Sequence, residues 1–144
     1  ILAKTEADLA GFDEGILLNQ NGTVSEGTGE NLFMVIDGAL HTPNIGDNNL
    51  TGITRDSIFQ LAQNEFNLAV TERHIQRSEL YLADEIFLTG TAAHVTPVGE
   101  IDNRPIGNGT VGPITKELQD TYATVIKGNN PKYMHWCSAV DVAG

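Results

Sequence analysis

The chain has 144 residues, of which 40% are hydrophobic, and its formal net charge at pH 7 is -11. This length is enough for one hydrophobic core and too short for two ordinary domains, so we expect a single domain over residues 1–144. The negative charge and the eight scattered Lys and Arg residues argue against nucleic acid or an anionic membrane surface as a partner, because both require clustered basic side chains.

Short apolar segments separated by glycine turns predict that the first third of the chain is mostly antiparallel sheet. The opening segment Ile1–Phe12 predicts the end of a helix that stops at Gly11. It is followed by an apolar segment at Gly15–Asn19 and by strands at Thr23–Glu26, Leu32–Ile36 and Ala39–Thr42, with turns at Asn21-Gly22, residues 27–29 and Asp37-Gly38.

Beyond residue 50 the apolar residues recur at helical spacing. Thr54–Phe66 predicts a helix with Thr54 as its N-cap, and Pro113 opens a second helix that ends at Gly128. The side chains expected to face the core are Ile58, Leu61, Ala62 and Phe66 in the first helix and Ile114, Leu118, Tyr122, Val125 and Ile126 in the second. Between them we expect strands at Leu68–Ile75 and Glu85–Leu88, a short helical turn at Ser78–Leu82, and an extended segment at Val95–Ile101 that turns at Asp102-Asn103. This mixture predicts an α+β or mixed α/β fold and not a doubly wound parallel sheet.

Three glycine-containing segments follow one another along the chain: V-S-E-G-T-G-E-N at Val24–Asn31, L-T-G-I-T-R at Leu50–Arg55 and L-T-G-T-A-A at Leu88–Ala93. Each alone predicts only a turn. Together, in this order, they resemble the class IV pyridoxal-phosphate (PLP) aminotransferases, most closely the branched-chain amino acid aminotransferases. The resemblance extends through Y-L-A-D-E at Tyr81–Glu85 and G-P-I-T-K at Gly112–Lys116. It implies that residues 1–144 are the larger, C-terminal, PLP-binding domain of the D-amino-acid/branched-chain aminotransferase fold, with meandering mixed sheets and flanking helices.

In the first of these motifs the resemblance assigns a cofactor-binding role to Glu26. PLP acts as an electron sink, and it does so best when its pyridine nitrogen is protonated. A carboxylate that is hydrogen-bonded to this nitrogen favours the protonated form. Without the family context, an S-E-G segment predicts only a hairpin loop with an exposed glutamate.

The second motif carries the predicted phosphate site. Gly52, Ile53 and Thr54 lie where a helix is expected to begin, and the free N–H groups at a helix start attract anions. The resemblance implies that the backbone of Ile53 and Thr54 and the Thr54 side chain hold the PLP phosphate, and that Leu50 packs on the ring. Many family members have proline where this chain has Thr51. On its own, G-I-T predicts a helix cap and nothing more.

The third motif follows a predicted buried strand, and its small residues leave room for a ligand to approach the backbone. The resemblance implies that Thr91 also contacts the phosphate, and that the backbone amides of Thr91 and Ala92 receive the substrate carboxylate. Many family members have glutamate where this chain has His94, which leaves the substrate preference open. A lone histidine is most often a solvated or core residue.

No catalytic residue is predicted within the chain. The family's Schiff-base lysine falls shortly before Ile1, and the small N-terminal domain, which supplies an arginine for the phosphate, also precedes this sequence. None of the four lysines, Lys4, Lys116, Lys127 and Lys132, is in register with it. We therefore expect the chain alone to be inactive. The resemblance implies a full-length homodimer that transfers an amino group between branched-chain L-amino acids and 2-oxoglutarate.

Other functions remain as alternatives. D-amino acid transaminase and aminodeoxychorismate lyase share the fold, and a non-catalytic fragment would retain only the fold. The four histidines show no H-x-x-x-H spacing and no C-x-x-C occurs, so no metal site is predicted. A nucleophilic hydrolase is not supported, because G-x-S-x-G is absent. The single cysteine, Cys137, fits a reducing compartment, and no apolar run approaches the length of a membrane span, so we expect a cytoplasmic protein.

Overall fold

A five-stranded sheet forms the centre of the molecule in the computed structural model, which describes residues 1–44 and 52–140. Its strands are β3 (Asn31–Ile36), β4 (Ala39–Thr42), β5 (Val70–Glu72), β6 (Glu85–Gly90) and β7 (His94–Pro97). They are arranged in the order β5-β4-β3-β6-β7. Strands β4 and β5 pair in parallel and the other neighbours pair antiparallel. This mixed sheet agrees with the predicted fold class.

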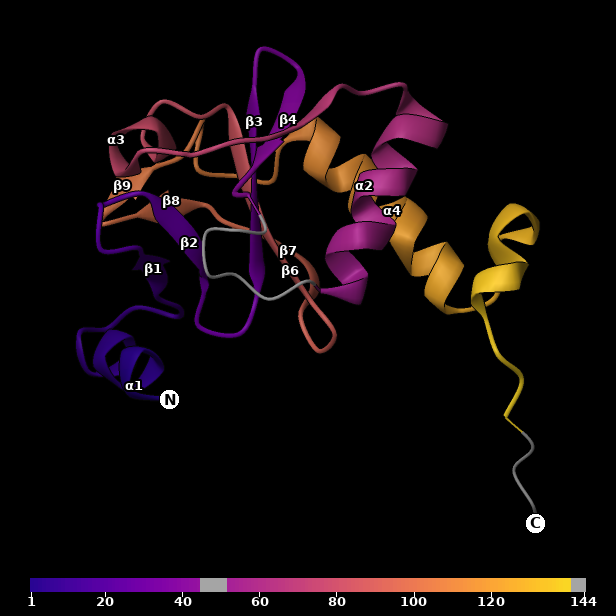
Figure 1. The fold of residues 1–144 in the computed structure, drawn as a ribbon, viewed down its shortest axis with the longest axis horizontal. Helices are drawn as coiled ribbons and strands as arrows, with labels where there is room; N and C mark the ends of the chain where they lie inside the picture. Colours follow the sequence, from indigo (N-terminus) through magenta and orange to yellow (C-terminus); the bar gives the residue numbers. More distant parts are fainter. Residues whose placement is uncertain (45–51, 141–144) are drawn as a thin grey trace.

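Two small sheets and two short helices lie on one side of the central sheet, and two long helices lie on the other (Figure 1). The small sheets pair β1 (Ile16–Leu18) with β2 (Val24–Gly27) and β8 (Glu100–Ile101) with β9 (Arg104–Pro105). The short helices are α1 (Leu2–Leu9) and α3 (Arg77–Leu80). The long helices are α2 (Ile53–Phe66) and α4 (Pro113–Ile126), and the 3-10 helix η1 (Pro131–Trp136) follows α4.

Both faces of the central sheet are buried, which explains why β3 and β6 are continuous apolar runs. Successive residues of a strand point to opposite faces. Phe33 therefore faces α2 and α4, where it stacks on Phe87 with ring centroids 5.1 Å apart. Its neighbours Leu32 and Met34 pack on the other side, in the cluster that includes residues of β2 and α3. This alternation fixes which face each residue at the strand ends points to.

Helix α4 is fastened to the sheet by the buried side chain of Glu85, at the start of β6. The two carboxylate oxygens accept hydrogen bonds from the backbone N–H groups of Ile114 and Thr115, at 3.1 and 2.7 Å, and from the Thr115 hydroxyl at 2.7 Å. A carboxylate is favoured there because the helix start is positive. Gly112 must be glycine, because a Cβ atom at this position would overlap with the Glu85 carboxyl group. The G-P-I-T-K motif is thus the docking point of α4.

Helix α2 begins earlier than its apolar pattern indicates. Its N-cap is Gly52, with φ -81° and ψ 136°, and Ile53 is the first helical residue. The prediction that Thr54 is the N-cap is therefore wrong, and Thr54 is instead a buried residue of the first turn. A Cβ atom on Gly52 would overlap with the Oδ1 atom of Asn31, so a side chain at this position would require Asn31 or α2 to move.

Other boundaries shift for local reasons. The strand predicted at 68–75 shortens to β5, because it pairs with β4 over three residues only. The extended segment predicted at 95–101 is divided between β7 and β8, and β9 and η1 were not predicted. Ile126, expected to face the core, lies in the last turn of α4 and is 43% exposed. The turns at Asn21-Gly22, Asp37-Gly38 and Asp102-Asn103 are confirmed by positive φ angles.

Candidate functional site

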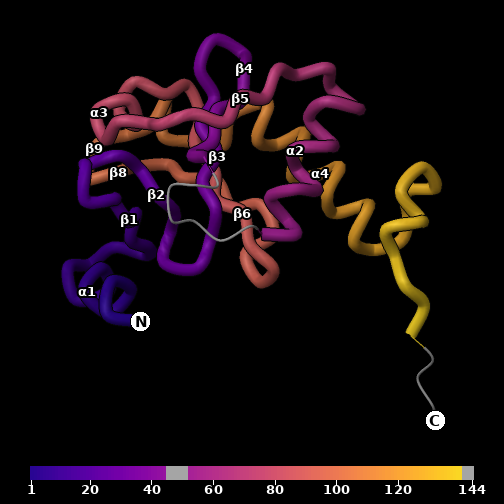
Figure 2. The backbone as a smooth tube through the Cα atoms, in the orientation of Figure 1, coloured from indigo at the N-terminus to yellow at the C-terminus, as the bar shows by residue number. Residues whose placement is uncertain are grey.

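The three glycine motifs meet at one end of the molecule. The turn between β2 and β3, the turn between β6 and β7 and the first residues of α2 lie at the same end in Figure 1, and the tube in Figure 2 shows the same arrangement. The first motif touches both of the others. Glu30 packs against Gly90, where a Cβ atom would be 3.2 Å from Glu30 Cγ, and Asn31 packs against Gly52. Segments far apart in the sequence therefore form one continuous region.

The N-cap of α2 is Gly52, which has no side chain with which to accept a hydrogen bond from the helix start. The first helical residue, Ile53, is 85% exposed. Thr54 follows and is buried. The free N–H groups of a helix start carry partial positive charge and bind anions readily. This end of α2 can therefore accept an anionic group from outside the described chain.

Behind the start of α2 lies a buried polar cluster that the sequence interpretation missed. Asn31 and Thr89 are directly paired across β3 and β6, so their side chains project to the same face, next to the Phe33–Phe87 pair. The Tyr122 hydroxyl of α4 donates to the Oγ1 atom of Thr54 at 3.4 Å. The apolar spacing of α4 correctly predicts that Tyr122 faces inward, but it carries no signal for this polar contact.

The residues assigned to ring and substrate contacts lie around this cluster. Glu26 is half-buried on β2, where the pairing of β1 and β2 shifts by one residue. Such bulges redirect side chains and often occur next to active sites. Thr91 and Ala92 are exposed in the β6–β7 turn. Leu50 lies outside the described residues.

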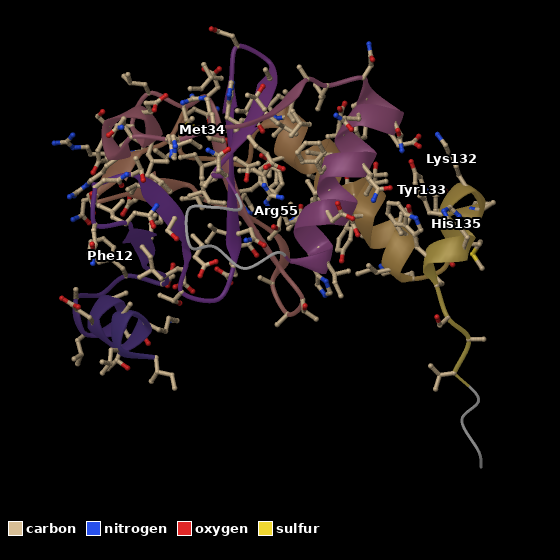
Figure 3. The ribbon with its side chains drawn as sticks, in the orientation of Figure 1. Phe12, Met34, Arg55, Lys132, Tyr133 and His135 are labelled. Atoms are coloured by element: carbon tan, nitrogen blue, oxygen red, sulfur yellow. The ribbon has the colours of Figure 1, made fainter. Side chains whose placement is uncertain are left out.

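Arg55, at the end of the second motif, is also buried, and its role was not predicted. Its Nη2 atom donates to the carbonyl oxygen of Pro43 at 3.2 Å and lies 3.3 Å from the Glu72 Oε1 atom. Figure 3 shows Arg55 in the interior of the molecule. The arginine thus ties the first turn of α2 to the end of β4 and to β5.

Each motif contains one buried polar side-chain atom that has no hydrogen-bond partner within residues 1–44 and 52–140. These atoms are Oε2 of Glu30, Nε of Arg55 and Oγ1 of Thr89. Buried polar atoms in native proteins are normally hydrogen-bonded, so each exception needs an explanation. The three exceptions fall one in each of the three motifs.

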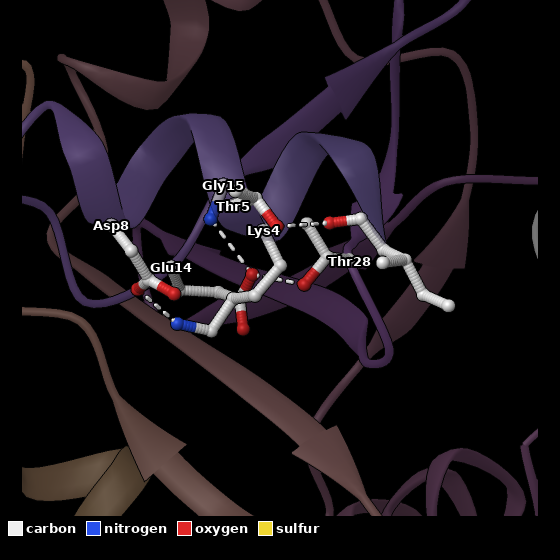
Figure 4. Close-up of polar contacts among 7 residues, drawn as sticks. Lys4, Thr5, Asp8, Glu14, Gly15 and Thr28 are labelled. Carbon is white, nitrogen blue, oxygen red and sulfur yellow. Dashed lines mark hydrogen bonds and ion pairs between the residues drawn. The ribbon is translucent and has the colours of Figure 1, made fainter.

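Glu30 lies in a small acidic group near α1. Burial raises the pKa of its carboxyl group, the negative charge of Glu14 raises it further, and Lys4 opposes both effects. Glu14 itself accepts hydrogen bonds from the backbone N–H of Gly15, at 2.7 Å, and from the Thr28 hydroxyl (Figure 4). Both hydrogen bonds end on the Oε1 atom of Glu14, whereas the Oε2 atom of Glu30 has no partner among the described residues.

The four lysines are engaged elsewhere or exposed. Lys4 forms an ion pair with Asp8 on α1, and Lys116 forms one with Asp120 on α4. Lys132 lies on η1, away from the motifs in Figure 3, and its Nζ atom is 2.5 Å from Glu65. Lys127 is exposed after the end of α4. Lys4 lies close enough to the first motif for its charge to act on Glu30, but its nitrogen is engaged by Asp8.

Two hollows adjoin this region. A groove of about 870 Å³ lies between α1, β1 and the segment from β7 to β9. A cleft of about 210 Å³ is lined by residues that include His94 and Tyr122. Neither hollow is lined by Glu26, Thr54 or Thr91, so a single cavity formed by these three residues stays a prediction.

Metal-binding and membrane-spanning features are both absent from the part of the chain that the structure describes. Within it, no group of three or more His, Cys, Asp and Glu side chains is arranged to hold a metal ion. None of its helices has both the length and the apolar character needed to cross a membrane.

Comparison with known proteins gives consistent matches. Residues 1–101 match the sequence model of the amino-transferase class IV family. The chain is 54% identical over 139 residues to a probable branched-chain-amino-acid aminotransferase of Aquifex aeolicus, and 44% identical over 141 residues to the branched-chain-amino-acid aminotransferase of Escherichia coli K12. These alignments cover 96% and 98% of this chain but 45% of each relative.

Solved structures agree with these matches. The T.th. branched-chain amino acid aminotransferase with pyridoxamine 5'-phosphate superposes with a TM-score of 0.94 at 47% identity, over 97% of this chain and 46% of that one. The PLP form of the enzyme from Thermobaculum terrenum superposes with a TM-score of 0.92 at 44% identity, over 95% of this chain and 45% of that one. The chain therefore spans less than half the length of the relatives that it matches.

Proposed function

The chain belongs to the class IV aminotransferase family, and we propose that it forms the PLP-binding part of an enzyme that transfers amino groups between branched-chain L-amino acids and 2-oxoglutarate. The observation that carries the proposal is the meeting of three motifs at the start of α2, where each motif has a buried polar atom without a partner among the described residues. Two relatives named as probable or established branched-chain-amino-acid aminotransferases are 54% and 44% identical to the chain. The family and the mixed α/β fold were both predicted correctly from the sequence.

The phosphate group of PLP fits the start of α2. The backbone N–H groups of Ile53 and Thr54 and the Thr54 hydroxyl would donate to it, and the Thr91 hydroxyl would add a donor from the β6–β7 turn. Gly52 and Gly90 carry no side chains, and both lie against residues of the first motif, so these segments approach one another closely. A phosphate would also suit the positive end of the helix.

Glu26 would hold the proton on the pyridine nitrogen. When bound, PLP supplies an electron sink, which this proton strengthens. The bulge in β2 is the local feature that would aim the Glu26 carboxylate at the ring. The backbone amides of Thr91 and Ala92 would orient the substrate by its carboxylate. Leu50 would pack on the ring, although it lies outside the described residues.

The remaining parts of the enzyme would come from outside these 144 residues. The proposal requires a lysine that would hold PLP covalently, and we assign this role to none of Lys4, Lys116, Lys127 and Lys132. It also places an N-terminal domain with a phosphate-binding arginine over the site, and a homodimer in the cytoplasm. This chain would then supply binding and orientation, and the rest of the protein would supply the covalent chemistry.

Two variants of α2 test the proposed phosphate site. Thr54→Val removes a hydroxyl that would donate to the phosphate, and Ser57→Ala removes one that already donates to the Ile53 carbonyl oxygen at 3.0 Å. Because a hydrogen bond to a charged group contributes about 1.5–3 kcal/mol, we expect Thr54→Val to weaken PLP binding by about tenfold or more, with no change for Ser57→Ala. Titration of the apoprotein at its natural length measures both constants. Equal effects of the two variants would contradict the assignment.

The reaction and the lysine are tested separately. Reduction with borohydride in the presence of PLP, followed by peptide mapping, should label no lysine of residues 1–144 stoichiometrically. Specific labelling of Lys4 with leucine transaminase activity would overturn this part of the proposal. Activity with D-amino acids only, or cleavage of aminodeoxychorismate, would replace the proposed substrates with those of another fold-type IV enzyme.

A further inference from the structure

Two helices meet through a hydroxyl pair beneath the proposed phosphate site. Tyr122 projects from α4 into the core, where it is 9% exposed, and its hydroxyl donates to the Thr54 Oγ1 atom in the first turn of α2 at 3.4 Å. The phenol ring belongs to the apolar cluster that lies between the long helices and the sheet, and Thr54 is buried beside it. This contact joins residues 68 positions apart in the sequence.

Accepting this hydrogen bond constrains the Thr54 hydroxyl. A hydroxyl group has one proton to donate and two lone pairs to accept with. A threonine near a helix start commonly turns its proton back to a backbone carbonyl, as Ser57 does toward Ile53. When a lone pair of Thr54 Oγ1 points to Tyr122, the Thr54 proton is directed away from the phenol.

We propose that Tyr122 is a positioning residue, which holds the Thr54 hydroxyl as a hydrogen-bond donor toward a phosphate group at the start of α2. This inference rests on the proposed function of the same site. Tyr122 does not touch the phosphate itself. It acts through Thr54. Because Tyr122 already holds the Thr54 side chain in one rotamer, Thr54 loses less conformational entropy when the phosphate binds.

The surrounding structure fixes the phenol in place. The phenol ring belongs to the buried cluster that includes Phe87 of β6 and Ile58 of α2. The centroids of the His94 and Tyr122 rings are 6.1 Å apart, and both residues line the same cleft. Tyr122 is therefore held relative to both the second and the third motifs.

A purely structural tyrosine would behave differently. If its hydroxyl only satisfied a buried polar atom, its loss would lower stability and would affect all ligands of the site alike. If it positions Thr54, its loss must act on the phosphate group of the ligand and must depend on the Thr54 hydroxyl. Pyridoxal, which has the ring and aldehyde of PLP but no phosphate, separates these cases.

The test is Tyr122→Phe in the protein at its natural length, which keeps the ring and removes the hydroxyl. Tyr133→Phe is the matched control, because Tyr133 is also buried and donates its hydroxyl to Glu65 in the last turn of α2, at the opposite end of that helix from Thr54. One neutral hydrogen bond contributes about 0.5–1.5 kcal/mol, so we expect Tyr122→Phe to weaken PLP binding about 2- to 10-fold. Pyridoxal affinity should not change, and Tyr133→Phe should change neither constant.

A double-mutant cycle then tests the route through Thr54. In a Thr54→Val background, Tyr122→Phe should cause no further loss of PLP affinity, because the intermediary hydroxyl is already absent. The ³¹P resonance of bound PLP should shift in Tyr122→Phe and stay unchanged in Tyr133→Phe. Inorganic phosphate, titrated into the apoprotein, should follow the same pattern as PLP.

The outcomes are distinct. Equal losses of PLP and pyridoxal affinity, or an undiminished effect of Tyr122→Phe in the Thr54→Val background, would overturn the positioning role. So would a lower melting temperature with unchanged PLP affinity. If the wild-type protein bound PLP no better than pyridoxal, the proposed phosphate site itself would fail.

Discussion

The two long helices begin in similar ways and differ in what completes their first turn. Helices α2 and α4 have 14 residues each, and each begins directly after a glycine whose side-chain position is occupied by a neighbouring polar group. At α4 that neighbour is the Glu85 carboxylate, which accepts hydrogen bonds from the helix start. At α2 the neighbour is the Oδ1 atom of Asn31, and the Gly52 N-cap has no side chain of its own. Glu85 completes the start of α4, whereas the start of α2 is where we propose that the phosphate binds.

The carboxylates of Glu85 and Glu30 also differ in how completely they are hydrogen-bonded. Both oxygens of Glu85 accept hydrogen bonds, and the residue is buried as part of the docking of α4. Glu30, next to Gly90, has one buried oxygen without a partner among the described residues, and its pKa is raised. Satisfied polar groups are what stability requires, and unsatisfied groups are tolerated where function requires them. This difference separates structural from functional polar residues without reference to any relative.

The largest expected effect is at the completed helix start. Glu85→Ala would leave three buried donors on Ile114 and Thr115 without an acceptor and would open a cavity beside Gly112. We expect a loss of about 3 kcal/mol or more in the free energy of unfolding, measured by urea denaturation. Glu85→Gln keeps one acceptor oxygen, so its loss should be about half as large.

The comparison also predicts what Glu85→Ala should leave intact. Under conditions in which the variant remains folded, its affinity for inorganic phosphate should stay within about twofold of wild type, because the start of α2 is untouched. A large loss of phosphate affinity with little loss of stability would show that the two helix starts do not have separate roles.

A smaller effect is expected at the open helix start. In Gly52→Ala the new Cβ atom would overlap with Asn31 Oδ1, so α2 or Asn31 must move. Overpacking of this kind costs about 1–3 kcal/mol. Because the N–H groups of Ile53 and Thr54 would shift together, we expect phosphate and PLP affinity to fall about tenfold, as measured by titration calorimetry.

Two further variants make this prediction specific. Gly29→Ala, in the β2–β3 turn, places its Cβ atom in open space and should have little effect on stability. Combining Gly52→Ala with Asn31→Ala removes the overlapping oxygen and should recover part of the lost stability, which a double-mutant cycle detects as favourable coupling. Strictly additive losses would mean that the overlap is not the cause.

Element boundaries that depend on local signals were predicted from the sequence, and those that depend on contacts between distant residues were not. Strand β4 was predicted with its observed bounds, and the ends of α2 and α4 at Phe66 and near Gly128 were close, because periodicity and glycine turns are local signals. The predicted start of α2 was one residue later than the observed start at Ile53. The glycine before the helix is favoured by its contact with Asn31, which lies 21 positions earlier in the sequence.

The same distinction between local signals and distant contacts applies to the residues of the candidate site. The three motifs were located from the sequence because the resemblance is carried by short runs of residues. The supporting residues Asn31, Thr89 and Tyr122 were missed as site residues, because each becomes informative only when strand pairing and helix packing bring it to the start of α2. Arg55 was visible in its motif, but its burial against Pro43 and Glu72 depends on contacts that spacing does not encode.

The smallest expected effect concerns Glu30 and depends on pH. A carboxyl group whose pKa is raised in the folded state binds its proton more tightly there than in the unfolded chain, so the folded state loses stability as pH rises from the ordinary pKa of 4.5 through the folded value. Glu30→Gln removes this titration and the repulsion by Glu14. We therefore expect the variant to be more stable than wild type at pH 7, by no more than about 1 kcal/mol because water screens the exposed part of the side chain, and equally stable below about pH 4. Urea denaturation across this pH range measures the difference, with Glu117→Gln on the exposed face of α4 as the control. A stability difference that grew as pH fell would contradict the raised pKa, and a pH-independent gain would assign the effect to packing against Gly90 instead of charge.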